Sequence, residues 1–358
     1  MSENISNKIN NITTPSPLTL KAEDEIFAKR FLRSNNQTIS NNDQPGILEV
    51  YADNFVEEIK KLSSLLDEYN YVGMDTEYPG TVYCVQNFTN DFYYKTLKMN
   101  VDKLKLIQVG ITLMNSKGEF PKNNKYHTWQ FNFEFDKDKE EITTSSLSLL
   151  EQCGIDFNKL KRKGIKHKDF AEYFMVSGLV LNPDILWVSF HGCYDFGYLL
   201  KLLISKNLPN TEKEFLDLLD TYFINYYDIK NMVKRKDNVK IGLNSLAQSL
   251  VVLRKGKTHQ AGSDSVVTID VFFKLKEYKF WNDNNIINFK NTLFGISNEE
   301  DNQETLNYEQ FCNLGYQNNN NSNNNNILYQ PYANLYNYYL INPQQNGSIP
   351  TQINSFMK

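Results

Sequence analysis

Cysteine is scarce in this 358-residue sequence, which contains only Cys84, Cys153, Cys193 and Cys312. They are scattered and none belongs to a CxxC pair, so neither a disulfide framework nor a zinc site is expected. The sequence also lacks any run of about 18 apolar residues, and its polar start, MSENISNKINNITTP, has no apolar core for a signal peptide. We therefore expect a soluble protein of the cytoplasm and nucleus with reduced thiols.

An excess of basic residues is missing as well. The sequence has 38 Lys and Arg against 42 Asp and Glu, which gives a formal net charge of −4. Binding to nucleic acid through a general basic surface depends on Lys and Arg that neutralise phosphates, so any contact with nucleic acid must be local. The content of 41% hydrophobic and 22% charged residues is that of an ordinary globular protein.

Low-complexity composition marks both ends of the chain. Residues 1–44 are rich in Asn, Ser and Thr and bury too little apolar surface to offset chain entropy, which predicts a disordered arm. Residues 296–358 form an Asn-, Gln- and Tyr-rich tail that includes NNNNSNNNN. We interpret this tail as passive, with partner binding through its tyrosines as the alternative. One α/β domain is expected between them, over residues 45–295.

Hydrophobic periodicity predicts the elements of this domain. Apolar residues recur at three- and four-residue steps over 55–69, which indicates a helix, and the runs 71–76, 104–113 and 129–135 read as three strands that can form a meander. Further helices are predicted over 144–152, 168–181, 195–204, 211–222, 243–253 and 261–280, and further strands over 185–190 and 225–229. The order of the predicted elements, with strands first and βα units later, favours a single α/β layer fold.

Two carboxylates stand together in the segment GMDTEYPG, where Asp75 and Glu77 end a predicted strand. Side chains two positions apart on a strand project from the same face, so both carboxylates can converge on one cation. A solvated surface pair is the alternative explanation, and this segment does not decide between the two.

Two more acidic residues lie at the boundaries of predicted elements. Asp195, in SFHGCYDFGYL, stands between an apolar strand and an apolar helix, where the strand's end opens a cleft. Asp264, in HQAGSDS, falls near the start of an apolar helix, five residues after His259. A helix N-cap, a favourable interaction with the helix dipole and a surface histidine would each explain one of these residues.

Together the four carboxylates offer oxygen ligands suited to Mg²⁺ or Mn²⁺. Two such cations about 4 Å apart are a known device for in-line cleavage of a phosphodiester. His259 supplies the general base that this chemistry needs. The combination predicts metal-dependent phosphodiester hydrolysis.

Five segments carry a resemblance to a known family. These segments are, in chain order, GMDTEYPG, NVDKLKLIQVGITLMN, WQFNF, SFHGCYDFGYL and HQAGSDS. Through them the sequence resembles the CAF-type (Pop/CAF) deadenylases, which are catalytic subunits of the Ccr–Not mRNA-decay complex. The resemblance covers about residues 46–294. It implies a DEDD-family exonuclease with a histidine in the third motif and an RNase H-like fold, in which helices flank a mixed central sheet. It also implies 3′ to 5′ shortening of mRNA poly(A) tails by two-metal hydrolysis, which releases 5′-AMP.

The resemblance assigns roles to particular residues. Its metal ligands fall on Asp75, Glu77, Asp195 and Asp264, and its catalytic histidine falls on His259. Because all five are present, an active enzyme is implied, with one metal held mainly by Asp75, Glu77 and Asp264 and the second by Asp75 and Asp195.

Three further positions need comment. Gly192 and Cys193 stand where the resemblance leads us to expect Ser-Gly, a departure that spares every proposed ligand and affects only local loop shape. Asp228 matches another aspartate of the family near the cleft. We assign it a supporting or structural role, and a helix N-cap before Lys230 is an equal alternative.

Binding of single-stranded RNA needs local cations and stacking surfaces. Arg254, Lys255 and Lys257 precede His259 and are candidates for phosphate contacts, with a solvated face as the alternative. A second basic group consists of Lys234, Arg235 and Lys236, which we interpret as a solvated face. The preference for adenosine has no signature of its own and depends on the resemblance.

The resemblance also implies partners, namely a Not scaffold protein, a leucine-rich-repeat deadenylase subunit and anti-proliferative adaptor proteins. A chain that acts chiefly as an adaptor, with catalysis dispensable, is one competing hypothesis, and it would tolerate loss of Asp75 or Glu77. A DNA proofreading or repair exonuclease shares the carboxylate chemistry and is the other. The family likeness of WQFNF and YDFGYL disfavours it.

Overall fold

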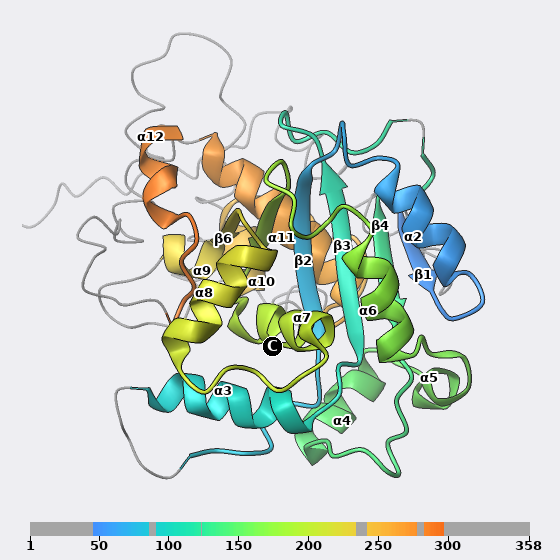
Figure 1. Cartoon of the computed structure of the whole chain (residues 1–358). Coiled ribbons are helices and arrows are strands. Elements are labelled where there is room, and N and C mark those ends of the chain that lie inside the picture. The colour runs from blue at the N-terminus through green and yellow to red at the C-terminus, as the bar shows by residue number, and fades with distance from the viewer. Residues whose placement is uncertain (1–45, 86–90, 123, 234–241, 278–282, 297–358) are drawn as a thin grey trace, which may run out of the picture. The chain divides into compact units, whose positions relative to one another are not determined.

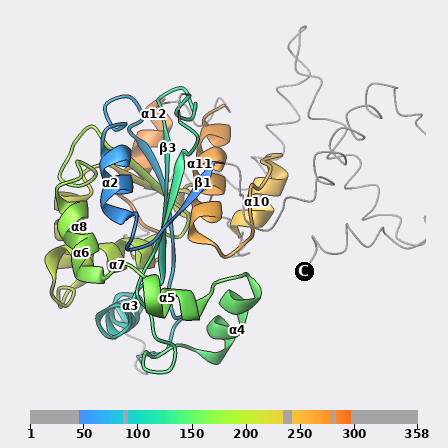
Figure 2. The same cartoon turned by 90° about the vertical axis from the view of Figure 1, so that its right-hand side faces the viewer.

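One six-stranded sheet, with helices on both of its faces, forms the centre of the computed structural model (Figures 1 and 2). The structure describes residues 46–85, 91–122, 124–233, 242–277 and 283–296, all of which belong to the unit Asp43–Asn324. The predicted arm, the tail beyond Ile296 and the basic group Lys234, Arg235 and Lys236 lie outside these residues. Within the described ranges, no helix has the length and apolar character needed to cross a membrane.

The sheet is mixed, as predicted. Its strands are β1 (Ile47–Val50), β2 (Tyr71–Glu77), β3 (Gln108–Met114), β4 (Thr128–Asn132), β5 (Leu186–Ser189) and β6 (Tyr226–Asp228). Their order is β1-β4-β3-β2-β5-β6. The antiparallel pairs β2–β3 and β3–β4 confirm the predicted meander, and β1–β4, β2–β5 and β5–β6 are parallel.

Helices cover both faces of the sheet. They are α2 (Phe55–Ser63), α3 (Phe92–Lys103), α4 (Thr144–Gln152), α5 (Phe157–Lys163), α6 (His167–Met175), α7 (Cys193–Ile204), α8 (Glu212–Tyr222), α9 (Ile229–Met232), α10 (Leu243–Ser249), α11 (Ala261–Lys276) and α12 (Asp283–Ile286), followed by the 3₁₀ turn Ile287–Phe289. α8 begins with a capping box between Thr211 and Glu214, which explains why its start agrees with the predicted one. α2 and α6 end about six residues earlier than predicted.

Several elements lie where none was predicted, among them β1, α3, α5, α12 and the 3₁₀ turn Ile287–Phe289. The predicted strand over 104–113 is also wrong in its first part, because the strand begins at Gln108. Leu104 and Leu106 are buried in the connection between α3 and β3, so they repeat like strand residues without belonging to the strand. Apolar burial in a packed connection gives the same short pattern as a strand.

The two faces of the sheet differ in chemistry. Phe131 of β4 packs against Phe55 of α2 and Phe170 of α6, with ring centroids 6.0 and 5.3 Å apart, which makes this face aromatic. The opposite face carries small and polar side chains and lies against α11, where the hydroxyl of Thr112 is 2.8 Å from that of Ser265. Figure 2 shows α2, α6 and α7 on one side of the sheet and α10 and α11 on the other.

The approach of α11 to the sheet is unusually close. A Cβ at Gly110 of β3 would lie only 2.0 Å from the carbonyl oxygen of Ala261, and a Cβ at Gly73 of β2 would lie 2.7 Å from that of Ser265. Both contacts involve backbone, which cannot move away as a flexible side chain can. Glycine at these two positions therefore lets the first turns of α11 rest directly on β2 and β3.

Candidate active site

Strand β2 carries the first two candidate ligands at its carboxyl end. In the antiparallel register, Asp75 pairs with Gly110 and Glu77 pairs with Gln108, so both carboxylates project from the face that α11 covers. Glu77 is buried and Asp75 half-buried. The period-two argument from the sequence therefore describes their shared face correctly.

Asp195 approaches the same end of β2 from the other side. It lies in the first turn of α7 and is buried, and its Oδ1 accepts a 2.7 Å hydrogen bond from the hydroxyl of Thr76. Thr76 stands between Asp75 and Glu77 in the chain and faces away from α11. This hydrogen bond fixes the second acidic motif relative to the first.

Asp264 and His259 come from α11 and the loop before it. Asp264 Oδ2 accepts the backbone N–H of His259 at 2.9 Å, and its Oδ1 is 2.6 Å from Nη1 of Arg254. The side chain of His259 is exposed, and its backbone has φ of +55°, in the left-handed region. Ligand atoms of Glu77, His259 and Asp264 all lie within 4.8 Å of one another, so elements far apart in sequence meet at one point.

Burial, together with crowding of negative charge, determines the electrostatics of this cluster. Burial, and then the charges of Asp264 and Asp195, raise the pKa of Asp75 and of Glu77 well above the ordinary range, while Arg254 lowers both. Burial raises the pKa of Asp195 to about 7, against the lowering effect of its hydrogen bond from Thr76. Carboxylates held together in this way favour either protons or a multivalent cation, and oxygen donors suit Mg²⁺ and Mn²⁺.

Comparison with known proteins decides the family. The model of the CAF1 family ribonucleases matches residues 50–175. The probable CCR4-associated factor 1 homolog 7 of Arabidopsis thaliana is 47% identical over 247 residues, which cover 67% of this chain and 90% of that protein. The chain belongs to the CAF1 ribonuclease family.

Other CAF1 relatives agree in sequence and in structure. Poly(A) ribonuclease pop2 of Schizosaccharomyces pombe is 40% identical over 237 residues, which cover 65% of this chain and 70% of pop2. The structure of the Mg²⁺- and Mn²⁺-bound form of S. pombe Pop2p matches with a TM-score of 0.67 and 39% identity. The match covers 70% of this chain and 99% of that chain. Yeast CAF1, crystallised with the NOT1 MIF4G domain, matches with a TM-score of 0.60 and 28% identity, over 72% of this chain and 100% of that chain. The RNase H-like fold is thereby confirmed.

The basic residues before His259 differ in their surroundings. Arg254 donates to the hydroxyl of Ser263 at 3.0 Å and to the side-chain oxygen of Asn244, in addition to its ion pair with Asp264. Its charge therefore offsets part of the negative charge of the acidic cluster, and its ion pair and hydrogen bonds distinguish it from a freely solvated cation. Lys255 lies over the ring of Phe120, 4.7 Å from the centroid, while Lys257 is exposed.

Asp228 has the contacts of a structural residue. It is fully buried at the end of β6, and its carboxylate accepts four backbone N–H groups, one of which is that of Lys230 at the start of α9. The other three donors are His191, Gly192 and Phe294, at 2.7, 3.2 and 3.1 Å. Through these bonds Asp228 holds the loop that leads into α7 and Asp195.

Gly192 and Cys193, at the junction of α7 and the loop before it, stand where the resemblance led us to expect Ser-Gly. A Cβ at Gly192 would lie 2.2 Å from the hydroxyl oxygen of Ser189, so a serine does not fit at this position of this loop. Cys193 is fully buried, and its Sγ lies 3.2 Å from the hydroxyl of Tyr93 on α3. Cys193 thus links the start of α7 to α3.

A set of buried amides supports the site and was not singled out from the sequence. Gln130 of β4 accepts the N–H of Gly262 and donates to the side chain of Gln260, both at 2.8 Å, so it holds the residue after His259 and the first turn of α11. Gln108 and Asn132 extend this network along the sheet. Gln108, Gln130 and Asn132 are at most 2% exposed. The signal available in the sequence was the polar half of the alternation in WQFNF, which contains Gln130 and Asn132.

The raised pKa values predict that metal affinity depends on pH. Lowering the pH from 8 to 6 crosses the pKa of about 7 of Asp195, so protons compete with the cation. We expect Mn²⁺ affinity, measured by calorimetric titration, to fall by up to about tenfold per pH unit for each proton displaced. An affinity that stays constant between pH 6 and 8 would contradict this electrostatic description.

Proposed function

We propose that this CAF1-family chain is a poly(A)-specific 3′ exoribonuclease that shortens mRNA A-tails and releases 5′-AMP by two-metal-ion hydrolysis. The observation that carries the proposal is the group of Glu77, His259 and Asp264, whose ligand atoms lie within 4.8 Å of one another, next to the carboxylates of Asp75 and Asp195 that interact with it electrostatically. The name of the pop2 relative, a poly(A) ribonuclease, supports the substrate. The Mg²⁺ and Mn²⁺ of the Pop2p structure support the cofactors.

The four carboxylates fit a pair of divalent cations. They supply oxygen ligands only, and the raised pKa values of Asp75 and Glu77 reflect burial and neighbouring negative charge that Arg254 offsets only in part. Glu77 and Asp264 would hold one cation, Asp195 would contribute to the other, and Asp75 would serve both. When bound, the cations activate water and offset charge on the phosphate and on the departing 3′ oxygen.

His259 would accept the proton of the attacking water. Its exposed ring lies beside Glu77 and Asp264, and its backbone is fixed by the hydrogen bond to Asp264 Oδ2. A base at this position is near enough to the proposed ligands to accept a proton from a water bound among them. Arg254, bound to the other oxygen of the same carboxylate, orients Asp264.

The decisive test of this function uses the purified full chain and labelled RNA that ends either in an A-tract or in mixed sequence. With Mg²⁺ or Mn²⁺ we expect shortening of the A-tract by single nucleotides, with AMP as product, and slower removal of the mixed end. EDTA should abolish both reactions. Trimming that persists in EDTA, or equal rates on the two ends, would contradict the proposal.

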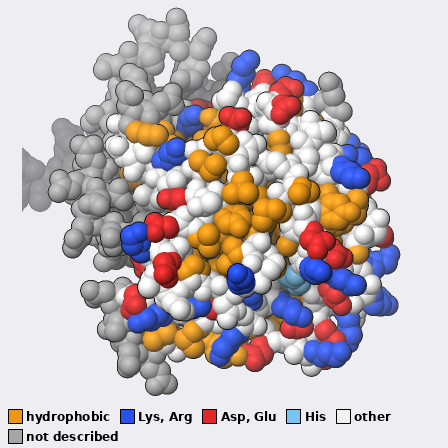
Figure 3. Space-filling model, in the orientation of Figure 1, with side chains coloured by type: hydrophobic (Ala, Val, Ile, Leu, Met, Phe, Trp, Pro, Cys, Tyr) orange, Lys and Arg blue, Asp and Glu red, His pale blue; other side chains and the backbone are white. Residues whose placement is uncertain are grey.

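A surface for protein partners is the second part of the proposal. Figure 3 shows hydrophobic side chains gathered near the centre of the face seen in Figure 1, with charged side chains around them. In the connection between α6 and β5, Val176 is 80% exposed and Leu181 is 50% exposed, so apolar side chains are accessible there as well. The complex of yeast CAF1 with the NOT1 MIF4G domain supports a Not scaffold as the partner.

The resemblance to the family supports three further proposals. They comprise assembly with a leucine-rich-repeat deadenylase subunit and anti-proliferative adaptors, a place in mRNA decay in the cytoplasm and nucleus, and a catalytic domain over residues 45–295. The exposed hydrophobic side chains also favour the competing adaptor function. Loss of a proposed ligand separates the two functions, since only an enzyme needs it.

A further inference from the structure

A small cavity lies beside the acidic cluster and differs from it in chemistry. Its volume is about 320 Å³, close to the lower end of the range for small-molecule sites. The residues that matter for its walls are Tyr78, Thr81, Phe92, Tyr93, His191 and Tyr194. None of the described side chains that line it is acidic, so it suits an uncharged aromatic group better than a cation.

Two walls of the cavity are joined directly to proposed metal ligands. Tyr78 follows Glu77 at the end of β2, and Tyr194 precedes Asp195 in the first turn of α7. Consecutive Cα atoms are about 3.8 Å apart, which leaves the cavity one residue from the cluster on both sides. A nucleotide whose phosphate lies at the cluster therefore has its base within reach of this cavity.

The two tyrosines form a fixed aromatic surface. Their rings stack with centroids 5.0 Å apart and an angle of 11° between the planes, and the side chain of Tyr194 is hydrogen-bonded to Thr81. Both tyrosines are half-buried, so part of each ring faces the cavity. Aromatic rings held in this way are platforms on which nucleic-acid bases stack.

Helix α3 supplies the opposite wall. Phe92 and Tyr93 line the cavity from its first turn, and the hydroxyl of Tyr93 lies 3.0 Å from Nε2 of His191 and 3.2 Å from Sγ of Cys193. Nδ1 of the same histidine is 3.0 Å from Nζ of Lys230. These contacts fix the orientation of the Tyr93 ring and place a cationic side chain behind the wall.

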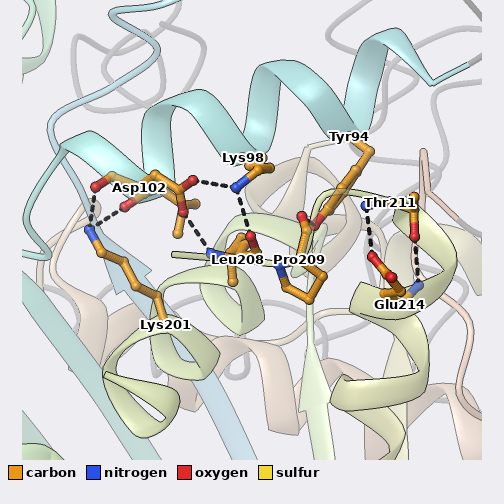
Figure 4. Close-up of polar contacts among 9 residues, drawn as sticks. Tyr94, Lys98, Asp102, Lys201, Leu208, Pro209, Thr211 and Glu214 are labelled. Atoms are coloured by element: carbon orange, nitrogen blue, oxygen red, sulfur yellow. Dashed lines mark hydrogen bonds and ion pairs between the residues drawn. The ribbon is translucent and has the colours of Figure 1, made fainter. Parts of the chain in front are cut away.

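Polar contacts on the other side of α3 anchor it to the α7–α8 connection (Figure 4). Tyr94 donates to the carbonyl of Pro209 at 2.6 Å, and Asp102 accepts the N–H of Leu208 at 2.8 Å. Lys201 of α7 donates to carbonyls at the C-terminal end of α3. The wall is therefore a rigid element, as a selective binding site requires.

We propose that this cavity is a subsite for the base of the RNA's 3′-terminal nucleotide, which packs between the Tyr78–Tyr194 surface and Tyr93. The inference rests on the proposed function for the identity of that base, adenine, and on the cavity for its location. The two tyrosines and Tyr93 bind and position the terminal nucleotide, and the chemistry itself remains with the carboxylates and His259.

The test combines a change in the protein with a change in the RNA. The protein variants are Tyr194→Leu and Tyr93→Leu, with Tyr194→Phe as the variant that keeps the ring and Tyr173→Leu as a control for a half-buried tyrosine of α6 outside this cavity. The RNA carries either an ordinary A-tract or one whose 3′-terminal nucleotide lacks its base. Initial rates in Mg²⁺ give kcat/KM for each combination.

For the wild-type chain we expect loss of the terminal base to lower kcat/KM by about 5- to 150-fold, the range for stacking of one base on an aromatic side chain. Tyr194→Leu and Tyr93→Leu should lower kcat/KM on the ordinary A-tract and have little effect on the baseless end. Tyr173→Leu should behave as wild type, and Tyr194→Phe, which keeps the ring but loses the hydrogen bond to Thr81, should keep the faster removal of the ordinary end over the baseless end. Equal removal of both ends by the wild-type chain, or equal slowing of both by the Leu variants, would overturn the subsite.

Binding of AMP and of ribose 5-phosphate in Mg²⁺, followed by calorimetry, tests the cavity without turnover. Tighter binding of AMP that is lost in Tyr194→Leu and kept in Tyr194→Phe supports the subsite even if no trimming is found, and then only the proposed function fails. Identical affinities for the two compounds in a chain that trims A-tails would overturn the subsite alone.

Discussion

Replacement of Asp75 by Asn is expected to lower A-tail trimming on the order of 10³-fold while making the metal-free protein more stable. The rate falls because Asp75 is the proposed ligand of both cations, each of which contributes several kcal/mol to the stabilisation of the transition state. Stability rises because the substitution removes a half-buried charge that Asp264, Asp195 and Glu77 repel. A metal ligand thus differs from an ordinary buried residue, whose loss destabilises.

The same repulsion fixes the direction of the pH dependence. A carboxyl whose pKa is higher in the folded than in the unfolded chain binds more protons when folded, so its stabilising contribution is complete below the unfolded pKa of about 4. That contribution is lost as the pH rises towards the folded value, which is about 7 for Asp195. We therefore expect the gain in stability of the metal-free protein from Asp75→Asn to be largest near pH 7 or above and to vanish near pH 4.

Thermal unfolding in EDTA and in Mn²⁺, together with trimming rates, measures both effects. Asp270→Asn is the matched control, because burial raises the pKa of this half-buried carboxyl on α11 to about 6 and Asp270 is not one of the proposed ligands. This control should keep trimming and the Mn²⁺-induced rise in Tm, and Asp75→Asn should lose both. If Asp75→Asn trims A-tails at the wild-type rate, the adaptor function is the correct one.

Replacement of His259 by Ala is expected to lower kcat by about 10²- to 10⁴-fold with little change in Mn²⁺ affinity. This is the range for loss of a general base. The geometry also permits another role, since a ring nitrogen of His259 lies within 4.8 Å of ligand oxygens of Glu77 and Asp264 and could bind a metal. Loss of a general base would leave the affinity for Mn²⁺ nearly unchanged, whereas loss of a metal ligand would lower it.

Calorimetric Mn²⁺ titration and trimming rates on the same preparations distinguish the roles. Asp264→Asn serves as the reference variant and should lose both Mn²⁺ binding and trimming, which shows that the titration responds to a missing ligand. His259→Ala should resemble it in trimming and differ from it in binding. Parallel loss of Mn²⁺ affinity in both variants would identify His259 as a ligand.

The sequence predicts the chemical groups of the site better than their surroundings. Asp75 and Glu77 share a face because of the strand period, and Asp195 and Asp264 begin helices, so local rules placed all four correctly on their elements. The ion pair of Arg254 with Asp264 had no such signal. It depends on how the loop of residues 251–260 folds back on α11, which no local pattern specifies.

The pairing of strands that are distant in sequence was likewise not predictable from local patterns. The meander from β2 to β4 follows from chain order, whereas β1 joins β4 in parallel across about 80 residues, and its four residues give too short a pattern to recognise. In β4, the aromatic half of the alternation indicated a buried face. The polar half is buried as well, because α11 covers Gln130 and Asn132, and alternation does not reveal a second layer.

The contact between Gly110 and Ala261 couples the evolution of two distant segments. Because backbone meets backbone there, any side chain at position 110 would push the start of α11 away, and with it the loop of His259 and the carboxylate of Asp264. A relative with a larger residue at this position must therefore have changed the path of its third motif too. Covariation of positions 110 and 261–262 among CAF1 sequences would record that constraint as a mark of retained activity.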